Sequence, residues 1–598
     1  MATAGRPTET IPPGEEVLGQ FLGDESFPVA WDSAVEQQLF WVYDDLHIPH
    51  PVSPMFFDIG GWWLSCDHMF RRFGTPFAVD WLAKTVNGYV YTTAIPADPA
   101  LRVEGTEYSS AYGARVPRDG AYAAQIGAYL DATLPVYGEH FADWWRDRLR
   151  PEMERNFAYL EARLDEADGL SLEELATVLE DAIDIHDRHW KIHWMLNFAQ
   201  LSATLNLRAV MERTRGSIDE ALLGRLQNSA SDRNWDSIEA LWRMKNEVRD
   251  DPELRTAFAP DDAASIVANL RASDRGRQFI DERVVPYQRE FGWHAVWSHE
   301  FIYPTRREQM EPVLELVRGY LQSDYDYPAA IEAMRRDIEA ASAEILDGLS
   351  GAALDEMRAA NAVNLRMAPL TPDHHFYIDQ GANAHVRLVL IAIGRKLVDL
   401  GRLAVADDVM FLRYNELRAL IGGVDIGASG LVATRRGERE AARRIKPRDW
   451  IGTVTPTQLA FPYLVNWGYP ERFHRGQAAD GSGDADRIEG IAGSPGVVEG
   501  TARVVQTVDE FDAVEDGDIL VCQMTNPAWV VLFTRIAGLV TDTGGTTSHP
   551  AVLSREFGIP AVIGTSDATH RIATGDRLRV DGSAGVVEIL ARSGSAGA

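Results

Sequence analysis

The stretch Thr541-Asp-Thr-Gly-Gly-Thr-Thr-Ser-His549-Pro-Ala-Val-Leu-Ser-Arg-Glu-Phe-Gly-Ile-Pro560 links a short apolar run to an amphipathic run through a Gly-Gly turn. The residues before it, from Gly538, have strand composition, whereas Pro550 to Phe557 have helical periodicity that ends at Gly558. Because proline suits the first position of a helix, we expect His549 at the N-cap or just before it. The sequence therefore predicts a strand, a glycine turn and a helix that begins beside a histidine.

This arrangement would provide several donors to a phosphate group. The first N–H groups of a helix have no intrahelical partners, glycines let the backbone approach a ligand closely, and hydroxyl groups add further donors. A neutral imidazole is a nucleophile at pH 7, and its phosphoramidate is a reactive donor. A phosphoryl group on His549 would therefore meet donors from Gly544, Gly545, Thr546, Thr547 and Ser548, and these residues leave its presence open. A capping histidine without a chemical role is the alternative.

Short strand-like runs separated by glycine turns surround the motif and predict a compact α/β domain over residues 488–594. They are Val497 to Val505, Asp518 to Cys522, Gly538 to Thr541, Pro560 to Gly564, Leu578 to Asp581 and Val586 to Leu590. Residues 475–487 (RGQAADGSGDADR) have the composition of a flexible linker.

Residues 26–474 show mainly helical periodicity, and the polar residues 1–25 are predicted to be a disordered tail. Ser171-Leu-Glu-Glu174 is a capping box that opens a helix reaching about Leu205. Further helices are expected at about Glu139 to Ala167, Ser217 to Ser229, Asp236 to Val248, Pro312 to Leu321, Pro328 to Leu349 and Ala384 to Leu400. This region is the candidate substrate-binding domain.

The formal net charge of −31 argues against a protein that grips nucleic acid or an anionic membrane surface, because both need a basic field. The two cysteines, Cys66 and Cys522, lie far apart and form no metal-type spacing, so no metal site is expected. No stretch is apolar enough for a membrane span, and the N-terminus lacks an apolar signal region, so we expect a cytoplasmic protein.

The C-terminal segment resembles the swivelling phosphohistidine domain of the phosphoenolpyruvate-utilising enzymes, the family of phosphoenolpyruvate synthase, pyruvate phosphate dikinase and rifampicin phosphotransferase. The resemblance includes Ile488-Glu-Gly-Ile-Ala-Gly-Ser-Pro-Gly496, Gly517-Asp-Ile-Leu-Val521, Thr525-Asn-Pro-Ala-Trp529, Gly544 to Gly564 and Val580-Asp-Gly582. It implies a multidomain fold, with a large mainly α-helical substrate-binding domain and a small α/β swivelling domain. It also implies that His549 is the phosphocarrier, although Pro550 stands where the family usually has alanine.

The helical region is similar to the substrate-binding domain of rifampicin phosphotransferase, through Pro51-Val-Ser-Pro54, Phe291-Gly-Trp-His294, Pro304-Thr-Arg-Arg-Glu308 and Asp407-Asp-Val-Met-Phe-Leu412. With Asp373-His-His-Phe-Tyr-Ile-Asp-Gln380, it looks closer to the histidine-bearing subunit of phenylphosphate synthase and related phenol dikinases. Single-chain members of these families begin with an ATP-grasp domain, and we find neither that domain nor a glycine-rich phosphate loop here. The resemblance therefore implies a separate ATP-grasp subunit that holds ATP and Mg²⁺, with no cofactor on this chain.

Three groups of residues are candidates for contact with the acceptor hydroxyl, which needs a base and charge stabilisation. The first is His186, His189 and His193 beside Trp190 and Trp194, for which structural packing is the alternative. The other two are His294, His299 and Glu300, and His374, His375, Asp379 and Arg387. We expect His294, His299 or His374 to be the base, and Arg306, Arg307 or Arg387 to clamp phosphate oxygens.

The 16 tryptophans would suit a flat aromatic ligand, although large helical cores also use them. Together with the resemblance to the phenol dikinases, they imply a small phenolic hydroxyl compound as the preferred acceptor. The alternatives are an antibiotic-like or other alcohol, a pyruvate-linked reaction, and a non-catalytic phosphorelay or regulatory module.

Overall fold

The computed structural model describes residues 15–45, 47–73, 78–96, 120–260, 262–323, 325–461, 464, 469–478, 486–505, 508–525, 529–533, 535–544, 549–565 and 567–593. The chain forms two compact units. The first comprises Met1–Ala203, His299–Ile302 and Tyr377–Gln477, and the second comprises Thr204–Ser298, Tyr303–Phe376 and Ala478–Ala598. The region 26–474, predicted to be one domain, is thus divided between both units. Periodicity identifies helices but does not show which helical faces pack together.

The first unit contains an antiparallel sheet of five strands in the order β1-β5-β2-β4-β3. The strands are β1 (Gly19–Phe21), β2 (Phe40–Tyr43), β3 (Ala78–Val86), β4 (Tyr89–Pro96) and β5 (Trp450–Val454). Asn87 and Gly88 join β3 to β4 with φ angles of 50° and 85°, as a two-residue hairpin turn requires.

Strand β1 corrects the prediction of a disordered tail through residue 25, because it pairs with β5. Pairing with a strand so distant in the chain leaves no local signal in the sequence. Residues 1–14 lie outside the described part of the chain.

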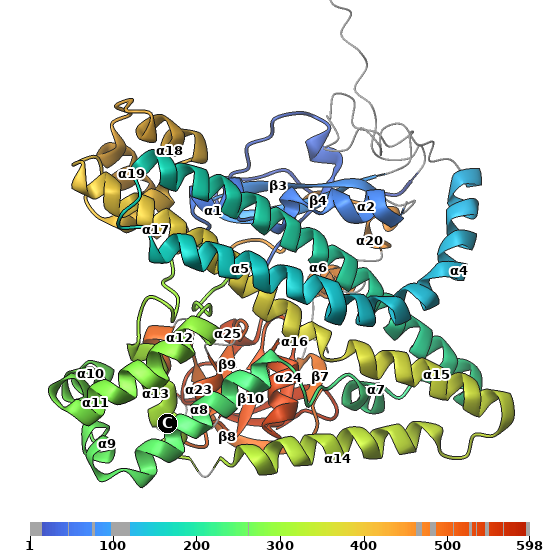
Figure 1. Cartoon of the computed structure of the whole chain (residues 1–598). Coiled ribbons are helices and arrows are strands. Elements are labelled where there is room, and N and C mark those ends of the chain that lie inside the picture. The colour runs from blue at the N-terminus through green and yellow to red at the C-terminus, as the bar shows by residue number, and fades with distance from the viewer. Residues whose placement is uncertain are drawn as a thin grey trace, which may run out of the picture. The chain divides into compact units, whose positions relative to one another are not determined.

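The long helices of the first unit include α5 (Arg150–Asp165), α17 (Asn383–Asp399) and the part of α6 (Leu172–Arg215) up to Ala203 (Figure 1). The predicted capping box begins α6, since Ser171 Oγ accepts a hydrogen bond from Glu174 N–H at 3.2 Å and Glu174 Oε2 accepts one from Ser171 N–H at 2.8 Å. Other helical elements that lie wholly or mainly in this unit include α1 (Pro54–Ile59), α2 (Asp67–Phe73), α4 (Gly120–Trp144), η6 (His375–Ala382, from Tyr377 on), η7 (Ala406–Phe411), α18 (Tyr414–Ile421), α19 (Ala428–Ala442), α20 (Pro456–Leu459) and α22 (Tyr469–Ala478).

The second unit begins with helices that follow the predicted pattern. They are α7 (Glu220–Leu226), α8 (Arg233–Asp250), α9 (Pro252–Ala257), α10 (Ala263–Ala272), α11 (Asp274–Phe279), α12 (Val285–Phe291), α13 (Glu311–Leu321), α14 (Tyr327–Leu346), α15 (Gly351–Met367) and α16 (Leu370–His374). The C-terminal α/β domain belongs to the same unit, and its Phe557 stacks on Tyr325 with ring centroids 5.9 Å apart.

The C-terminal domain is built on an eight-stranded sheet in the order β6-β13-β12-β8-β9-β10-β11-β7. Its strands are β6 (Arg487–Glu489), β7 (Ile491–Ser494), β8 (Val497–Val504), β9 (Ile519–Cys522), β10 (Gly538–Thr541), β11 (Ala561–Ile563), β12 (Arg577–Asp581) and β13 (Val586–Ala591). Strands β8 to β11 are parallel, and helices α23 (Val530–Phe533), α24 (His549–Glu556) and α25 (Ala568–Arg571) accompany them. The strands expected from the sequence are confirmed to within about one residue.

Strands β9, β10 and β11 are buried on both faces, as expected for parallel strands. Ile519 and Val521 of β9 face one apolar cluster, whereas Leu520 and Cys522 face the other. The segment between the last helix and the first strand is shorter than the predicted linker, residues 475–487. Helix α22 continues to Ala478, and strand β6 begins at Arg487. Residues 479–485 lie outside the described part of the chain.

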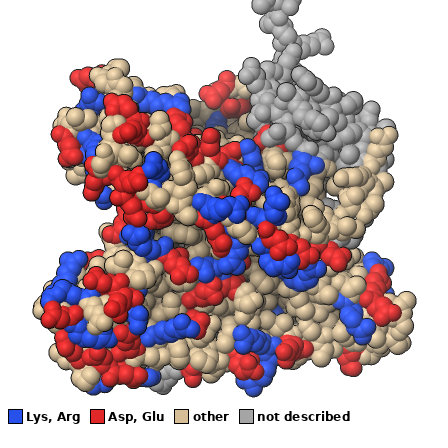
Figure 2. All heavy atoms as spheres, viewed as in Figure 1, with Lys and Arg blue, Asp and Glu red and all other residues tan. Residues whose placement is uncertain are grey.

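Acidic and basic side chains are interspersed over the face drawn in Figure 2. Many of them form local ion pairs on helices, such as Arg146 with Asp143 at 3.0 Å and Arg150 with Glu154 at 2.9 Å. Within the described ranges, no helix is long and apolar enough to cross a membrane.

Candidate functional site

The backbone around His549 has the predicted order of strand, turn and helix. Strand β10 ends at Thr541, Gly544 has a φ of 123°, and α24 begins at His549. His549 is thus the first residue of the helix and Pro550 the second. The sequence predicts Pro550 as the first residue, so the helix begins one residue earlier than expected. The predicted phosphate-binding residues Gly545, Thr546, Thr547 and Ser548 lie outside the described residues.

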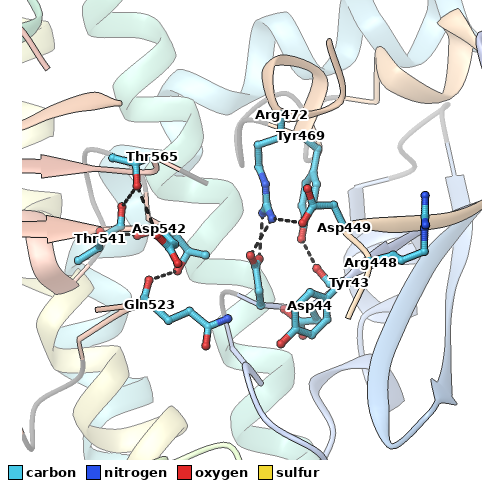
Figure 3. Close-up of polar contacts among 12 residues, drawn as sticks. Tyr43, Asp44, Arg448, Asp449, Tyr469, Arg472, Gln523, Thr541, Asp542 and Thr565 are labelled. Carbon is cyan, nitrogen blue, oxygen red and sulfur yellow. Dashed lines mark hydrogen bonds and ion pairs between the residues drawn. The ribbon is translucent and has the colours of Figure 1, made fainter. Parts of the chain in front are cut away.

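A buried carboxylate holds the chain just before this loop (Figure 3). Asp542 Oδ1 accepts a hydrogen bond from the backbone N–H of Thr569 at 2.9 Å, and Oδ2 accepts one from the Thr569 hydroxyl. The Thr565 hydroxyl lies 3.0 Å from the Thr541 carbonyl oxygen and 3.4 Å from Asp542 Oδ1. Asp542 therefore joins the end of β10 to the start of α25. This role was not predicted from the sequence.

The neighbouring strand β9 holds the same segment through backbone and hydroxyl bonds. The N–H of Asp542 donates to the Cys522 carbonyl at 3.1 Å, and the N–H of Thr543 donates to the Gln523 carbonyl at 3.0 Å. The Thr543 hydroxyl also donates to the Gln523 carbonyl oxygen at 3.0 Å. The loop that leads to His549 thus starts from a backbone held on two sides.

Glycine is required where this loop meets the end of β11. Gly564 has a φ of 65°, and a Cβ atom at this position would lie 2.8 Å from the Gly544 carbonyl oxygen. A larger residue would therefore press on the backbone that leads to His549.

In the first unit, three of the predicted side chains converge. Asp379 Oδ1 lies 3.6 Å from His299 Nε2 and 3.9 Å from His193 Nδ1, and all three residues are buried. His193 Nε2 is 2.7 Å from Asn197 Nδ2. The expectation that this chain binds no metal stays a prediction.

Tryptophans surround this group. Trp190 lies 4.7 Å from the His193 ring and 5.8 Å from the His299 ring, measured between centroids. Trp194 packs edge-on against His193 at 5.1 Å and against Trp62 at 5.6 Å. All three indoles are buried, so they form an apolar wall behind the polar group.

Two further residues of the first unit belong to the same neighbourhood but were missed from the sequence. His47 Nδ1 lies 2.7 Å from Asp44 Oδ1, and the His47 ring packs against His299 with centroids 5.4 Å apart. A carboxylate three residues before a histidine, directly after a strand, was a signal in the sequence that could have indicated them.

Glu300 and Arg387 hold the segment that carries His299 in place. The Glu300 carboxylate accepts hydrogen bonds from the backbone N–H and hydroxyl of Ser53, both at 2.5 Å, and from the N–H groups of Phe301 and Ile302 at 2.6 and 3.2 Å. Burial raises the pKa of this carboxyl, and these donors oppose that effect. Arg387 donates to the Phe301 carbonyl oxygen and to Asp407 at 3.0 Å. These contacts favour scaffold roles for both side chains, and their roles as base and phosphate clamp stay predictions.

His186 and His189 of α6 have structural contacts. His186 Nε2 lies 2.9 Å from Asn383 Oδ1 and accepts a hydrogen bond from Trp190 Nε1–H at 2.9 Å, while His189 Nε2 lies 3.2 Å from Asn156 Nδ2. Burial lowers the pKa of His186 to about 4, so its ring is neutral at pH 7. These contacts favour a packing role for His186 and His189.

The predicted residues of the second unit are also enclosed. His294 Nδ1 lies 3.0 Å from the Phe291 carbonyl oxygen, and burial, followed by the nearby Arg306 charge, lowers the pKa of His294 to about 3. His374 Nδ1 lies 3.3 Å from the Leu370 carbonyl oxygen, and its ring is 4.1 Å from that of His375. Arg306 is buried, and its N–H donates to the His294 carbonyl at 2.9 Å. These contacts favour structural roles for His294 and Arg306.

Comparison with known proteins agrees with this geometry. Residues 514–585 match the phosphoenolpyruvate-utilising enzyme mobile domain, and residues 192–367 match the rifampicin phosphotransferase fourth domain. The C-terminal α/β domain is a mobile domain of the phosphoenolpyruvate-utilising enzymes. The first match includes His549 and Asp542, and the second includes His193, His294 and His299.

Three relatives indicate how far the similarity extends. The Bacillus subtilis (strain 168) protein named uncharacterized phosphotransferase YvkC is 26% identical over 556 residues, which cover 93% of this chain and 62% of that protein. Chondramide synthase cmdD of Chondromyces crocatus is 28% identical over 594 residues, covering 94% of this chain and 14% of the synthase. A rifampicin phosphotransferase from a Streptomyces species is 31% identical over 338 residues, covering 55% and 36%. The chain spans less than two thirds of the length of each relative.

Proposed function

We propose that this chain is the carrier and acceptor component of a dikinase-type phosphotransferase, in which the mobile domain carries the phosphoryl group on His549. The observation that carries the proposal is that α24 begins at His549, shortly after the end of strand β10, which Asp542 joins to α25. A phosphoryl group there would meet the unpaired N–H groups and the positive end of the helix dipole. The match to a mobile domain of phosphoenolpyruvate-utilising enzymes supports the same role.

The phosphoryl donor in this proposal is ATP, bound with Mg²⁺ on a separate ATP-grasp subunit. The 598 residues contain no glycine-rich phosphate loop of the P-loop type. Mg²⁺ usually binds through substrate phosphates and a few carboxylates, so it would travel with ATP on the partner. The relatives contain long segments outside the part that matches this chain. In the proposal, a function carried by such a segment is supplied here by a separate subunit.

We propose a small phenolic hydroxyl compound as the acceptor, bound in the first unit. Support comes from the aromatic wall of Trp62, Trp190 and Trp194 beside the polar group of His299 and Asp379. Indole faces suit a flat aromatic ring, and the polar group suits its hydroxyl. A rifampicin-like hydroxyl compound is the second candidate, because relatives are named rifampicin phosphotransferase.

The test is the intact mass of the chain after incubation with Mg²⁺ and ATP, with and without a candidate ATP-grasp protein. We expect an acid-labile phosphoryl group that requires the partner and is absent from His549→Asn. Addition of phenol, rifampicin or pyruvate in parallel would then identify the acceptor by loss of the phosphoryl group and appearance of a phosphorylated product. A stable phosphoprotein that no small hydroxyl compound discharges would favour a regulatory module. A chain that never becomes phosphorylated would refute the carrier role.

A further inference from the structure

The loop after strand β2 places an acid and a histidine in a fixed relative position. Asp44 N–H donates to the Val90 carbonyl of β4 at 3.0 Å, and Ile48 N–H donates to the Asp44 carbonyl at 3.0 Å. Asp44 is 3% exposed, whereas 28% of the His47 side chain is exposed. The acid is therefore enclosed by the scaffold while the imidazole reaches the surface of the first unit.

Both oxygens of Asp44 are engaged. Oδ1 lies 2.7 Å from His47 Nδ1, and Oδ2 accepts a hydrogen bond from Trp62 Nε1–H at 2.7 Å. Because the indole nitrogen is only a donor, Trp62 fixes the rotation of the carboxylate. The carboxylate in turn fixes the imidazole, with its Nδ1 proton toward Asp44.

This arrangement is suited to proton transfer at the other ring nitrogen. When Nδ1 carries its proton toward a carboxylate, the neutral imidazole has its lone pair on Nε2, as in carboxylate–histidine pairs that act as general bases. Burial lowers the pKa of His47, but the charge of Asp44 and its hydrogen bond outweigh burial, so the pKa is raised above its ordinary value of 6.5. The same pairing lowers the pKa of Asp44, although burial alone would raise it.

Other charged groups face this pair from neighbouring segments. Asp379 of η6 and Asp45 of the same loop both raise the pKa of His47, and His299 lies beside its ring. Of the histidines close to Asp379 in the first unit, His193 and His299 are 8% and 10% exposed by side chain, compared with 28% for His47. His47 is therefore the imidazole of this group with the most access to a small molecule.

We propose that His47 is the general base that takes the proton from the acceptor hydroxyl, and that Asp44 is its positioning residue; this inference rests on the proposed function. In the transfer, the acceptor oxygen forms a bond to phosphorus while the nitrogen–phosphorus bond of phospho-His549 breaks. The hydroxyl proton moves to Nε2 of His47, and the electron pair of the broken bond returns to the imidazole of His549. His47 thus replaces His294, His299 and His374 as the candidate base.

The experiment separates loading of His549 from its discharge. Wild type, His47→Ala and Asp44→Asn are first phosphorylated with Mg²⁺, ATP and the ATP-grasp partner, and the loaded proteins are isolated and mixed with phenol. We expect equal loading in all three, and discharge that is about 100-fold slower or more in His47→Ala, because a general base typically contributes that much. Added imidazole should restore part of the rate. The exposed histidine of α4 gives the matched control, His140→Gln, which should discharge like wild type.

The pH dependence distinguishes a base from a structural histidine. Wild-type discharge should rise with pH and level off above the raised pKa of His47. In Asp44→Asn, the loss of the negative charge lowers that pKa, so the rise should shift to lower pH and the plateau rate should fall. Normal loading with unchanged discharge and pH profile in both variants would overturn the role of the pair. Absence of loading in wild type would instead refute the proposed function. If His47→Ala fails to fold, the shift in Asp44→Asn decides the question.

Discussion

Arg472 of α22 forms a two-pronged ion pair with Asp45, with its Nη1 and Nη2 atoms 3.0 and 2.8 Å from the two carboxylate oxygens. Nη2 also lies 3.1 Å from Asp449 Oδ1, and the Tyr469 hydroxyl donates to the Tyr43 carbonyl at 2.6 Å. The last helix before the linker is thereby attached to the loop that carries Asp44 and His47. The side chains of Arg472 and Asp45 are 11% and 2% exposed.

Arg472→Met should destabilise the first unit by about 3–5 kcal/mol, because it leaves the Asp45 charge buried without its partner. The double variant Asp45→Asn/Arg472→Met should recover part of this loss, as the unpaired charge is removed. Chemical denaturation measures both. Arg418→Met is the control, since its pair with Glu180 is about half exposed and should contribute less than about 1 kcal/mol. A double variant that is as unstable as the sum of its single variants would contradict the coupling.

Gly564→Ala should slow phosphorylation of His549, because its Cβ would press on the Gly544 carbonyl oxygen at the start of the loop. Gly558→Ala is a matched control, since its φ of 66° is similar but nothing lies within 4 Å of the added Cβ. Both variants should lose roughly 1–2 kcal/mol from the positive φ. Only Gly564→Ala should lose loading rate, measured by intact mass over time. Equal loading in both variants would show that this contact does not position the loop.

Glu300→Gln should reduce stability rather than the rate of phosphoryl transfer. The amide would point an N–H₂ group at donors from Ser53 and Phe301, which leaves buried donors without acceptors and costs about 1–3 kcal/mol. Thermal unfolding at pH 8 tests the loss of stability, and discharge of loaded protein at low temperature tests the rate. Glu173→Gln, at an exposed position of α6, is the control and should change neither. A large rate defect in stably folded Glu300→Gln would return Glu300 to the catalytic candidates.

His186 should make the first unit less stable as the pH falls. Burial lowers its pKa from 6.5 to about 4, so between these values the unfolded chain binds a proton that the folded chain does not. Its contribution to stability is therefore fully present above pH 6.5 and is lost as the pH falls below it, by roughly 1 kcal/mol at pH 5.5. The free-energy difference between wild type and His186→Gln should shrink by that amount between pH 7.5 and 5.5. A difference that is constant with pH would contradict the buried neutral state.

Local patterns in the sequence predicted much of the C-terminal domain. Glycine turns and short apolar runs set the ends of its strands, and Gly558 marked the end of α24 within two residues. The capping box at Ser171 likewise predicted the start of α6. These signals are reliable because each depends on residues within one or two turns of each other.

Long-range contacts were not predictable in the same way. Strand β1 forms only because β5 offers a partner far along the chain, and Glu300 reaches Ser53, 247 residues away. No local pattern indicated that donors would enclose Glu300, or that Asp44 and Trp62 would orient His47. Candidate residues chosen for their chemistry alone therefore included side chains whose contacts favour structural roles, and they omitted His47.

By itself, the sequence determined the presence of a strand–turn–helix motif with His549 at the helix start, because strand composition, glycine and proline act through the local backbone. The tertiary structure decided which imidazoles are buried and neutral and which are paired with a carboxylate. It also decided that the Glu300 carboxylate is occupied by hydrogen bonds from backbone and hydroxyl donors. These properties depend on burial and on distances between residues remote in sequence, and both change a side chain's pKa and its access to a ligand. His47 and Asp44 emerged as candidates only at that level.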